Sequence, residues 1–219
     1  MKLLLTSAGL TNKSISDALL ELIGKPASET MIAFIPTAMN VESGDKDWVI
    51  DDLNNLYKQE FKSIDIVDIS ALPKTIWQPR LEAANVLVFC GGNTSHLMRW
   101  IKESGLSELL PEMLKTKVWV GISAGSIVTN PLLTVSSKDD KIYYEEKFGY
   151  NNEQALGLVD FYTRPHYNSP SFPHSRKDII GAIAEETGKT IYALDDNSAI
   201  KVVDGKIEVI SEGDYFKFN

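Results

Sequence analysis

Short apolar runs alternate with amphipathic segments through the first half of the chain. The runs, rich in β-branched residues, predict strands at 3–6, 31–35, 64–69, 86–90 and 118–122. The segments between them predict helices at 14–23, 48–57, 81–84, 94–103 and 106–115. Strands separated by helices form right-handed βαβ units, which build a parallel sheet covered on both faces. The pattern therefore predicts an α/β fold, with ligands at the carboxyl ends of the strands.

The pattern changes after residue 130. Short apolar stretches occur at 132–135, 157–159 and 161–163, a charged stretch at 138–147, and a helical pattern at 175–186. The tail predicts strands at 190–194, 198–203 and 206–210, with an Asp204-Gly205 hairpin turn between the last two. We expect this tail to be antiparallel and to lie at a sheet edge. Because no linker interrupts the chain, residues 1–219 are expected to form a single domain.

Charge and composition exclude several partners. The net charge is −8 and no Lys/Arg cluster occurs, which argues against binding to nucleic acid or an anionic membrane. No window approaches the length of an apolar membrane span, and the first apolar run is too short for a signal peptide. The only cysteine, Cys90, cannot form an intrachain disulfide, which is consistent with a cytoplasmic location. Small molecules and peptides remain as ligands.

The fifth predicted strand runs directly into Gly121-Ile122-Ser123-Ala124-Gly125. A buried strand that turns at once into a helix through Gly-x-Ser-x-Gly holds its serine on a tight bend with the hydroxyl exposed. The same residues also suit a plain glycine-rich turn with a capping serine. Cys90-Gly91-Gly92-Asn93-Thr94 follows the fourth predicted strand, where two glycines let backbone N–H groups approach a ligand, beside Ser123 if the fourth and fifth strands are neighbours. The N–H groups of Gly92 and Ala124 are thus expected to form an oxyanion hole.

A serine nucleophile needs a general base, and the chain has three histidines. His96 lies on a predicted helix and His174 at a helix start, whereas His166 follows a predicted strand and the stiff Pro165. We favour His166 as the base, with His174 as the alternative. A carboxylate should orient its imidazole. Asp195 and Asp196 both follow a predicted strand, and Asp139 and Asp140 compete from a charged loop.

The same motifs resemble those of peptidase family S51, the dipeptidase E and cyanophycinase family, over nearly the whole chain. They are Gly91-Gly92-Asn93-Thr94, Gly121–Gly125, Pro165-His166 and Leu194–Ser198. The resemblance implies a class I glutamine-amidotransferase-like fold, a flavodoxin-like three-layer sandwich. It also implies Ser123 as nucleophile and His166 as base. The family acid is usually a Glu followed by Gly, and the matching position here is Asp196, followed by Asn197.

The resemblance also suggests a substrate. Dipeptidase E-like members cleave dipeptides with an N-terminal aspartate, which an arginine after the histidine is suited to bind. Arg176 is similar to that segment, and Arg164 is a second candidate. We expect Gly91, Asn93 and Arg176 to contact a small peptide, and we expect no metal or cofactor. A homodimer would be compatible with such a fold.

Other functions use parts of the same pattern. A lipase or esterase would share the strand-to-helix bend, but its acid would precede its histidine in the chain. A cysteine-dependent member of the same broad fold would carry cysteine where Ser123 stands. A binding protein without activity is a third alternative, because Asp196 replaces the usual glutamate. Cys90 ends a strand and is expected to be a core residue.

Overall fold

The computed structural model describes residues 1–133 and 138–218. Its first part contains, in chain order, β1 (Lys2–Thr6), α1 (Lys13–Ile23), the 3₁₀ helix η1 (Ala27–Glu29), β2 (Met31–Ile35), the 3₁₀ helix η2 (Thr37–Val41), α2 (Asp47–Tyr57), β3 (Ser63–Ile66), α3 (Lys74–Ala83), β4 (Val86–Phe89), α4 (Thr94–Glu103), α5 (Leu106–Met113) and β5 (Val118–Ile122). The second part contains α6 (Ala124–Ile127), α7 (Lys138–Phe148), β6 (Tyr162–Arg164), α8 (Lys177–Thr187), β7 (Ile191–Leu194), β8 (Ser198–Val203), β9 (Lys206–Ser211) and β10 (Tyr215–Phe218).

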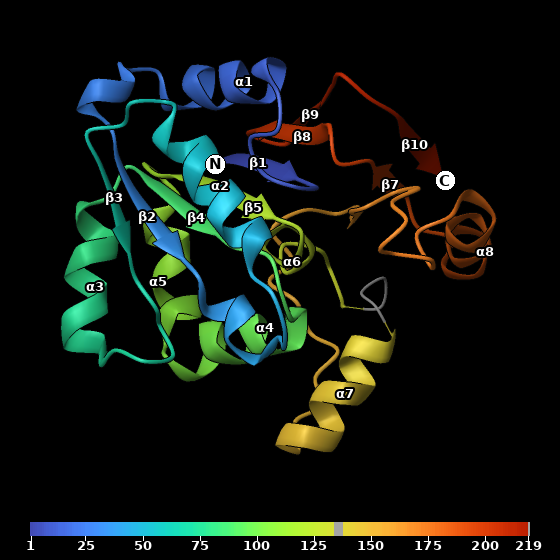
Figure 1. The fold of residues 1–219 in the computed structure, drawn as a ribbon. Helices are drawn as coiled ribbons and strands as arrows, with labels where there is room; N and C mark the ends of the chain where they lie inside the picture. Colours follow the sequence, from blue (N-terminus) through green and yellow to red (C-terminus); the bar gives the residue numbers. More distant parts are fainter. Residues whose placement is uncertain (134–137, 219) are drawn as a thin grey trace.

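The main sheet has the strand order β3-β2-β4-β5-β1-β8-β9 within the described ranges. The five strands from β3 to β1 are parallel, and β8 and β9 add an antiparallel edge beside β1. Helices α1 and α2 lie on one side of this sheet, and α3, α4 and α5 lie on the other (Figure 1). The predicted α/β class, with its mostly parallel sheet and antiparallel C-terminal edge, is confirmed.

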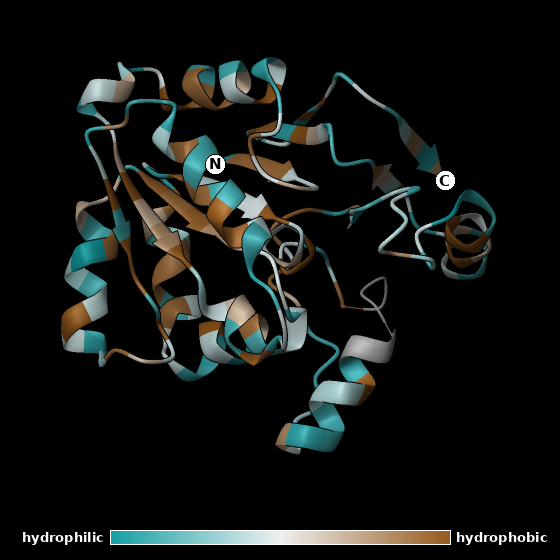
Figure 2. Cartoon of the chain, viewed as in Figure 1, coloured by the Kyte–Doolittle hydropathy of each residue, from teal (hydrophilic) through white to brown (hydrophobic). Residues whose placement is uncertain are grey.

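The central strands are buried on both faces, which explains why their sequences are almost continuously apolar. Along β1, Leu3 and Leu5 pack into the core beneath α3, α4 and α5, whereas Leu4 packs into the core beneath α1 and α2. Figure 2 shows β1, β2, β4 and β5 as the hydrophobic centre of the molecule. Phe89 on β4 and Trp119 on β5 stack with their ring centroids 3.7 Å apart, so the two neighbouring strands also pack through their side chains.

A second, smaller sheet has the order β10-β7-β6. Strands β6 and β7 are parallel and β10 is antiparallel to β7, while α8 covers one face through Ile180 and Ala184. The tail was predicted to lie wholly at the edge of one sheet, but it divides between two. Strands β8 and β9 join the main sheet, and β7 leaves it because β6 and β10 provide its hydrogen-bonding partners.

Other elements also differ from the sequence expectations. Helix α3 begins seven residues before the predicted Leu81, and includes Pro79. The charged stretch that contains Asp139 and Asp140 was read as a loop but forms α7, and the side chains of these two residues lie outside the described part. Of the strand expected at 132–135, Leu132 makes an isolated bridge to Gln154, and residues 134–135 are not described. In the described ranges, no helix has the length and apolar character needed to cross a membrane.

Candidate active site

The carboxyl ends of β1, β4 and β5 lie side by side because these strands are neighbours in the parallel sheet. Each strand is followed at this edge by residues of the site: Ser7 follows β1, Gly91-Gly92 follow β4, and Ser123 follows β5. These residues line a cavity of about 820 Å³. The sheet therefore brings three segments that are far apart in the sequence into one site.

Ser123 stands on a strained bend between β5 and α6. Its φ is +49°, a conformation that a serine rarely adopts. Two glycines make the bend possible: a Cβ on Gly121 would lie 2.4 Å from the Gly125 carbonyl oxygen, and a Cβ on Gly125 would lie 2.1 Å from that of Phe89. The Ser123 N–H donates to the Thr6 carbonyl at 3.1 Å, which fastens the bend to β1. The Gly-x-Ser-x-Gly spacing thus serves the tight turn that keeps the serine accessible.

His166 and Asp196 reach the cavity from the second sheet. They follow β6 and β7, which are parallel neighbours, so both residues emerge at the same edge. His166 Nε2 lies 2.9 Å from Ser123 Oγ, and His166 Nδ1 lies 2.6 Å from Asp196 Oδ1. The Phe172 ring stacks on the imidazole at a centroid distance of 4.0 Å. The structure therefore places Ser123, His166 and Asp196 in one hydrogen-bonded chain.

Asp195 and Asp196 have different surroundings, which distinguishes the two acids that the sequence left open. Asp195 accepts hydrogen bonds from the Ser198 hydroxyl at 2.6 Å and from the Asp214 N–H at 2.7 Å, so it holds the turn beside β10. Asp196 faces His166. Burial acts to raise the pKa of Asp196, but hydrogen bonds from His166 and Ser7, with the charge of His166, lower it below the ordinary value. Asp196 is therefore ionised at neutral pH.

Sequence reasoning missed Ser7, which is fully buried. Its hydroxyl donates to Asp196 Oδ1 at 2.9 Å and accepts the backbone N–H of His166 at 2.8 Å. The position after the first parallel strand was the available signal, because that edge is where parallel sheets place ligands. Ser7 therefore connects the main sheet to both residues that the second sheet supplies.

The glycine loop after β4 approaches the backbone of η2 closely. Gly92 has a φ of +124°, and a Cβ there would lie 2.4 Å from the Ala38 carbonyl oxygen. That carbonyl accepts the Asn93 N–H at 2.9 Å, whereas no partner in the described part of the chain accepts the N–H of Gly92 or Ala124. Both Gly91 and Gly92 line the cavity. The N–H groups of Gly92, in this loop, and of Ala124, the residue after Ser123, are therefore available as hydrogen-bond donors.

Two residues expected to contact substrate have other partners. Asn93 is buried and caps α4, where its side-chain oxygen accepts the His96 N–H at 3.0 Å. The Arg176 guanidinium donates to the carbonyl oxygens of Phe172, Ser169 and its own neighbour Ser175, so it braces the loop that carries Phe172. Neither lines the cavity, whereas Arg164, the second candidate, does, with its Nε donating to Ser175 Oγ at 3.1 Å.

The remaining histidines and the cysteine are not among the residues that line the cavity of Ser123. His96 Nδ1 is 2.9 Å from the Tyr144 hydroxyl, and burial lowers the pKa of His96 to about 4. His174 does not line the cavity. Cys90 is buried, and its pKa is raised first by burial and then by the charge of Asp52, so its thiol stays protonated. Across the described residues, no group of three or more His, Cys, Asp or Glu side chains could hold a metal ion.

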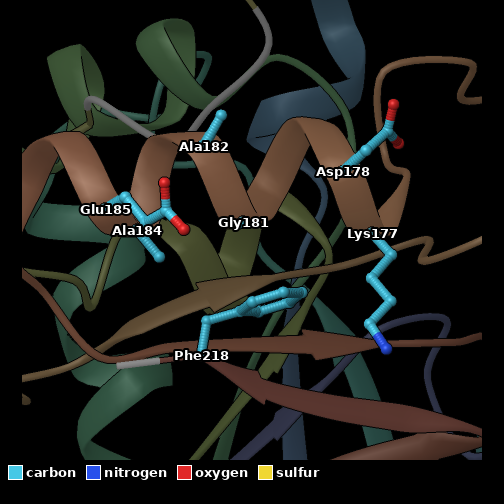
Figure 3. Close-up of a pocket in the computed structure, with 7 residues that line it drawn as sticks. All are labelled: Lys177, Asp178, Gly181, Ala182, Ala184, Glu185 and Phe218. Carbon is cyan, nitrogen blue, oxygen red and sulfur yellow. The ribbon is translucent and has the colours of Figure 1, made fainter.

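A second cavity, of about 630 Å³, lies between one face of α8 and Phe218 of β10. Figure 3 shows the Phe218 ring under Gly181, with Lys177 and Asp178 at one end of the helix. The described residues that line it include no serine, cysteine or histidine. The described lining of this cavity therefore lacks a serine and histidine like those of the first cavity.

An α/β fold that presents a hydrogen-bonded serine, histidine and aspartate at the carboxyl ends of its strands has the architecture of a hydrolase. The model of peptidase family S51 matches residues 3–210. The chain therefore belongs to peptidase family S51 and is a peptidase.

Relatives of known sequence or structure agree with this assignment. An uncharacterised peptidase of Pasteurella multocida is 28% identical over 86% of this chain and 88% of its own length. One from Listeria monocytogenes is 30% identical over 83% of this chain and 85% of its own length. A crystal structure of a Listeria monocytogenes protein provisionally named peptidase E has a TM-score of 0.80 at 27% identity, covering 97% of this chain and 98% of that one. A peptidase from an acI-B1 actinobacterium, at 15% identity and a TM-score of 0.67 over 99% of this chain and 93% of its own, shares the fold.

Proposed function

We propose that this protein is a serine peptidase that hydrolyses short peptides through an acyl-enzyme on Ser123. The observation that carries the proposal is the continuous hydrogen-bonded chain from Ser123 Oγ through both ring nitrogens of His166 to Asp196. Serine is a weak nucleophile at neutral pH, and a base within hydrogen-bond reach is what activates it.

The proposed first step is attack of Ser123 Oγ on the scissile carbonyl carbon. His166 Nε2 takes the hydroxyl proton as the new C–O bond forms, and Asp196 stabilises the imidazolium through Nδ1. The N–H groups of Gly92 and Ala124 donate to the developing oxyanion. His166 then returns its proton to the leaving amine as the C–N bond breaks. Water, deprotonated by the same imidazole, attacks the ester and releases the acid and free Ser123.

The proposed substrates are dipeptides, including those with an N-terminal aspartate. The cavity of about 820 Å³ is suited to a small molecule rather than a long chain. Arg164 lines its wall and supplies a guanidinium for a substrate carboxylate, a role first expected of Arg176. A cytoplasmic location and a homodimer remain parts of this proposal.

The test compares wild type with Ser123→Ala and Ser28→Ala on a set of Xaa-Leu dipeptides, with release of leucine as the readout. Ser28 is an exposed serine of η1 and controls for substitution as such. We expect Ser123→Ala to abolish release and Ser28→Ala to retain it. Equal release by wild type and Ser123→Ala would refute the serine mechanism. Cleavage of p-nitrophenyl esters without any dipeptide cleavage would identify an esterase instead.

A further inference from the structure

Asp52 carries a carboxyl group that is buried beside the cavity of Ser123. It lies on α2, is 6% exposed and lines the same cavity as Ser123. In residues 1–133 and 138–218, no hydrogen bond or ion pair reaches its carboxylate oxygens. Burial, followed by repulsion from Asp51, raises the pKa of Asp52 to about 7. Among the described residues, the fully buried side-chain polar atoms without a hydrogen-bond partner are His96 Nε2 and Thr163 Oγ1, so the Asp52 oxygens keep access to the cavity. A donor of a ligand in the cavity can therefore pair with this desolvated carboxyl group.

The position of Asp52 connects it to the nucleophile. A Cβ on Gly9 would lie 2.5 Å from Asp52 Oδ1 and 3.4 Å from the side chain of Ile122, the residue before Ser123. One helical turn earlier on α2, Trp48 packs 3.3 Å from the Cβ position of Gly91, which in turn is 3.4 Å from Ser123 Cβ. The face of α2 that carries Trp48 and Asp52 therefore forms the wall of the cavity next to Ser123.

The charges on this wall favour a cation. Asp51 and Glu42 line the cavity with Asp52. Arg164 also lines the cavity, as do His166 and its partner Asp196. A ligand with a protonated amine would give Asp52 the charge-assisted hydrogen bond that the described residues do not provide.

We propose that Asp52 binds the α-ammonium group of a short peptide and so directs Ser123 to the bond after the first residue. The inference rests on the proposed peptidase function and adds the residue that selects peptides with a free N-terminus. A peptide with an acylated N-terminus would leave the Asp52 carboxylate buried and unpaired. The other source of a cationic nitrogen is a lysine side chain, which the experiment separates from the α-amine.

The test measures binding by calorimetry to full-length Ser123→Ala protein, so that turnover does not interfere. The probes are Xaa-Leu dipeptides covering the common amino acids at the first position, each with a free or an acetylated N-terminus. We expect the free forms to bind at least about tenfold more tightly, in line with a hydrogen bond to a charged group. Adding Asp52→Asn should remove this preference. Adding Asp47→Asn, which removes an exposed charge from the same helix, should preserve it.

Several outcomes would overturn the assignment. Equal binding of free and acetylated peptides would do so, as would a preference that survives Asp52→Asn, or no binding of any probe. If acetyl-Lys-Leu bound tightly and lost this affinity with Asp52→Asn, Asp52 would bind the ammonium group of the lysine side chain instead of the α-ammonium group. If wild type cleaved no dipeptide while Ser123→Ala showed the Asp52-dependent preference, the peptidase proposal would fail and the ammonium site would stand.

Discussion

The Ser7 hydroxyl donates a hydrogen bond to Asp196 Oδ1 at 2.9 Å, across the boundary between the two sheets. That same carboxylate oxygen lies 2.6 Å from His166 Nδ1, and the Ser7 oxygen also accepts the His166 backbone N–H. Ser7 touches neither Ser123 nor a reacting atom in these interactions. Its role is to position the histidine and aspartate relative to the main sheet.

Replacing Ser7 with alanine should therefore lower kcat by about tenfold while KM changes little, because a hydrogen bond to a charged group is lost. The lost hydrogen bond should also raise the pKa of Asp196, since Ser7 is one of the groups that lower it. NMR titration of the Asp196 carboxyl and steady-state kinetics check the two effects. An unchanged kcat and an unchanged Asp196 titration would contradict the positioning role.

Asp195 and Asp196 form a matched pair of adjacent acids. Asp196→Asn should lower kcat by about 10³- to 10⁴-fold, because the amide cannot stabilise the imidazolium or hold its tautomer. Asp195→Asn should instead lower the melting temperature, because the carboxylate fastens the turn beside β10. Kinetics and thermal unfolding of both variants make the comparison. The reverse pattern would assign the acid to Asp195.

Gly91 and Gly92 should respond differently to alanine. Gly92→Ala places a Cβ 2.4 Å from the Ala38 carbonyl oxygen at a φ of +124°, so we expect a loss of about 3 kcal/mol or more. In Gly91→Ala the Cβ lies 3.3 Å from the Trp48 ring and 3.4 Å from Ser123 Cβ, and the nearest backbone atom given, the Ile122 carbonyl oxygen, is at an ordinary contact distance of 3.7 Å, so this change should cost about 1 kcal/mol. Urea unfolding measures both. If Gly92→Ala were as stable as Gly91→Ala, the loop after β4 would be able to move away from η2 at little cost in free energy.

Substitution of Arg164 and of Arg176 by glutamine tests which of the two arginines contacts the substrate. Arg164→Gln should reduce the preference for Asp-Leu over Asn-Leu, because Arg164 lines the cavity. Arg176→Gln should leave that preference intact and lower the melting temperature, since it loses hydrogen bonds that hold the 169–175 loop. The ratio of kcat/KM for the two dipeptides is the readout. If this ratio changed in Arg176→Gln and not in Arg164→Gln, Arg176 would be the arginine that contacts the substrate, as the sequence predicted.

The buried carboxyl of Asp52 makes stability depend on pH. Its folded-state pKa, about 7, exceeds the ordinary value of 3.8, so the folded protein binds this proton more tightly than the unfolded chain. Stability should consequently fall as pH rises from 4 to 7, by at most about 4 kcal/mol. Asp52→Asn should be more stable than wild type at pH 8, with the difference vanishing near pH 4. Urea unfolding at both pH values measures this, and a pH-independent difference would contradict it.

Local sequence determined much of this protein. The alternation of apolar runs and amphipathic segments predicted the parallel sheet, because period and length are local properties. Gly121–Gly125 predicted the bend at Ser123 from the sterics of its glycines, and the stiff Pro165 singled out His166. These signals depend on residues within one turn or strand of each other.

Only the tertiary structure decided which segments meet. The divided tail depends on strand pairing across long sequence separations, which moved β7 and its Asp196 to a second sheet beside β6. In the folded protein Asp196, and not Asp195, lies against His166. Ser7 contacts both His166 and Asp196. The Arg176 guanidinium donates to backbone carbonyl oxygens. Asp52 lies within a predicted helix, and only tertiary packing buries it beside the cavity, with no partner among the described residues. Contacts of this kind depend on the packing of distant elements, and no local pattern encodes them.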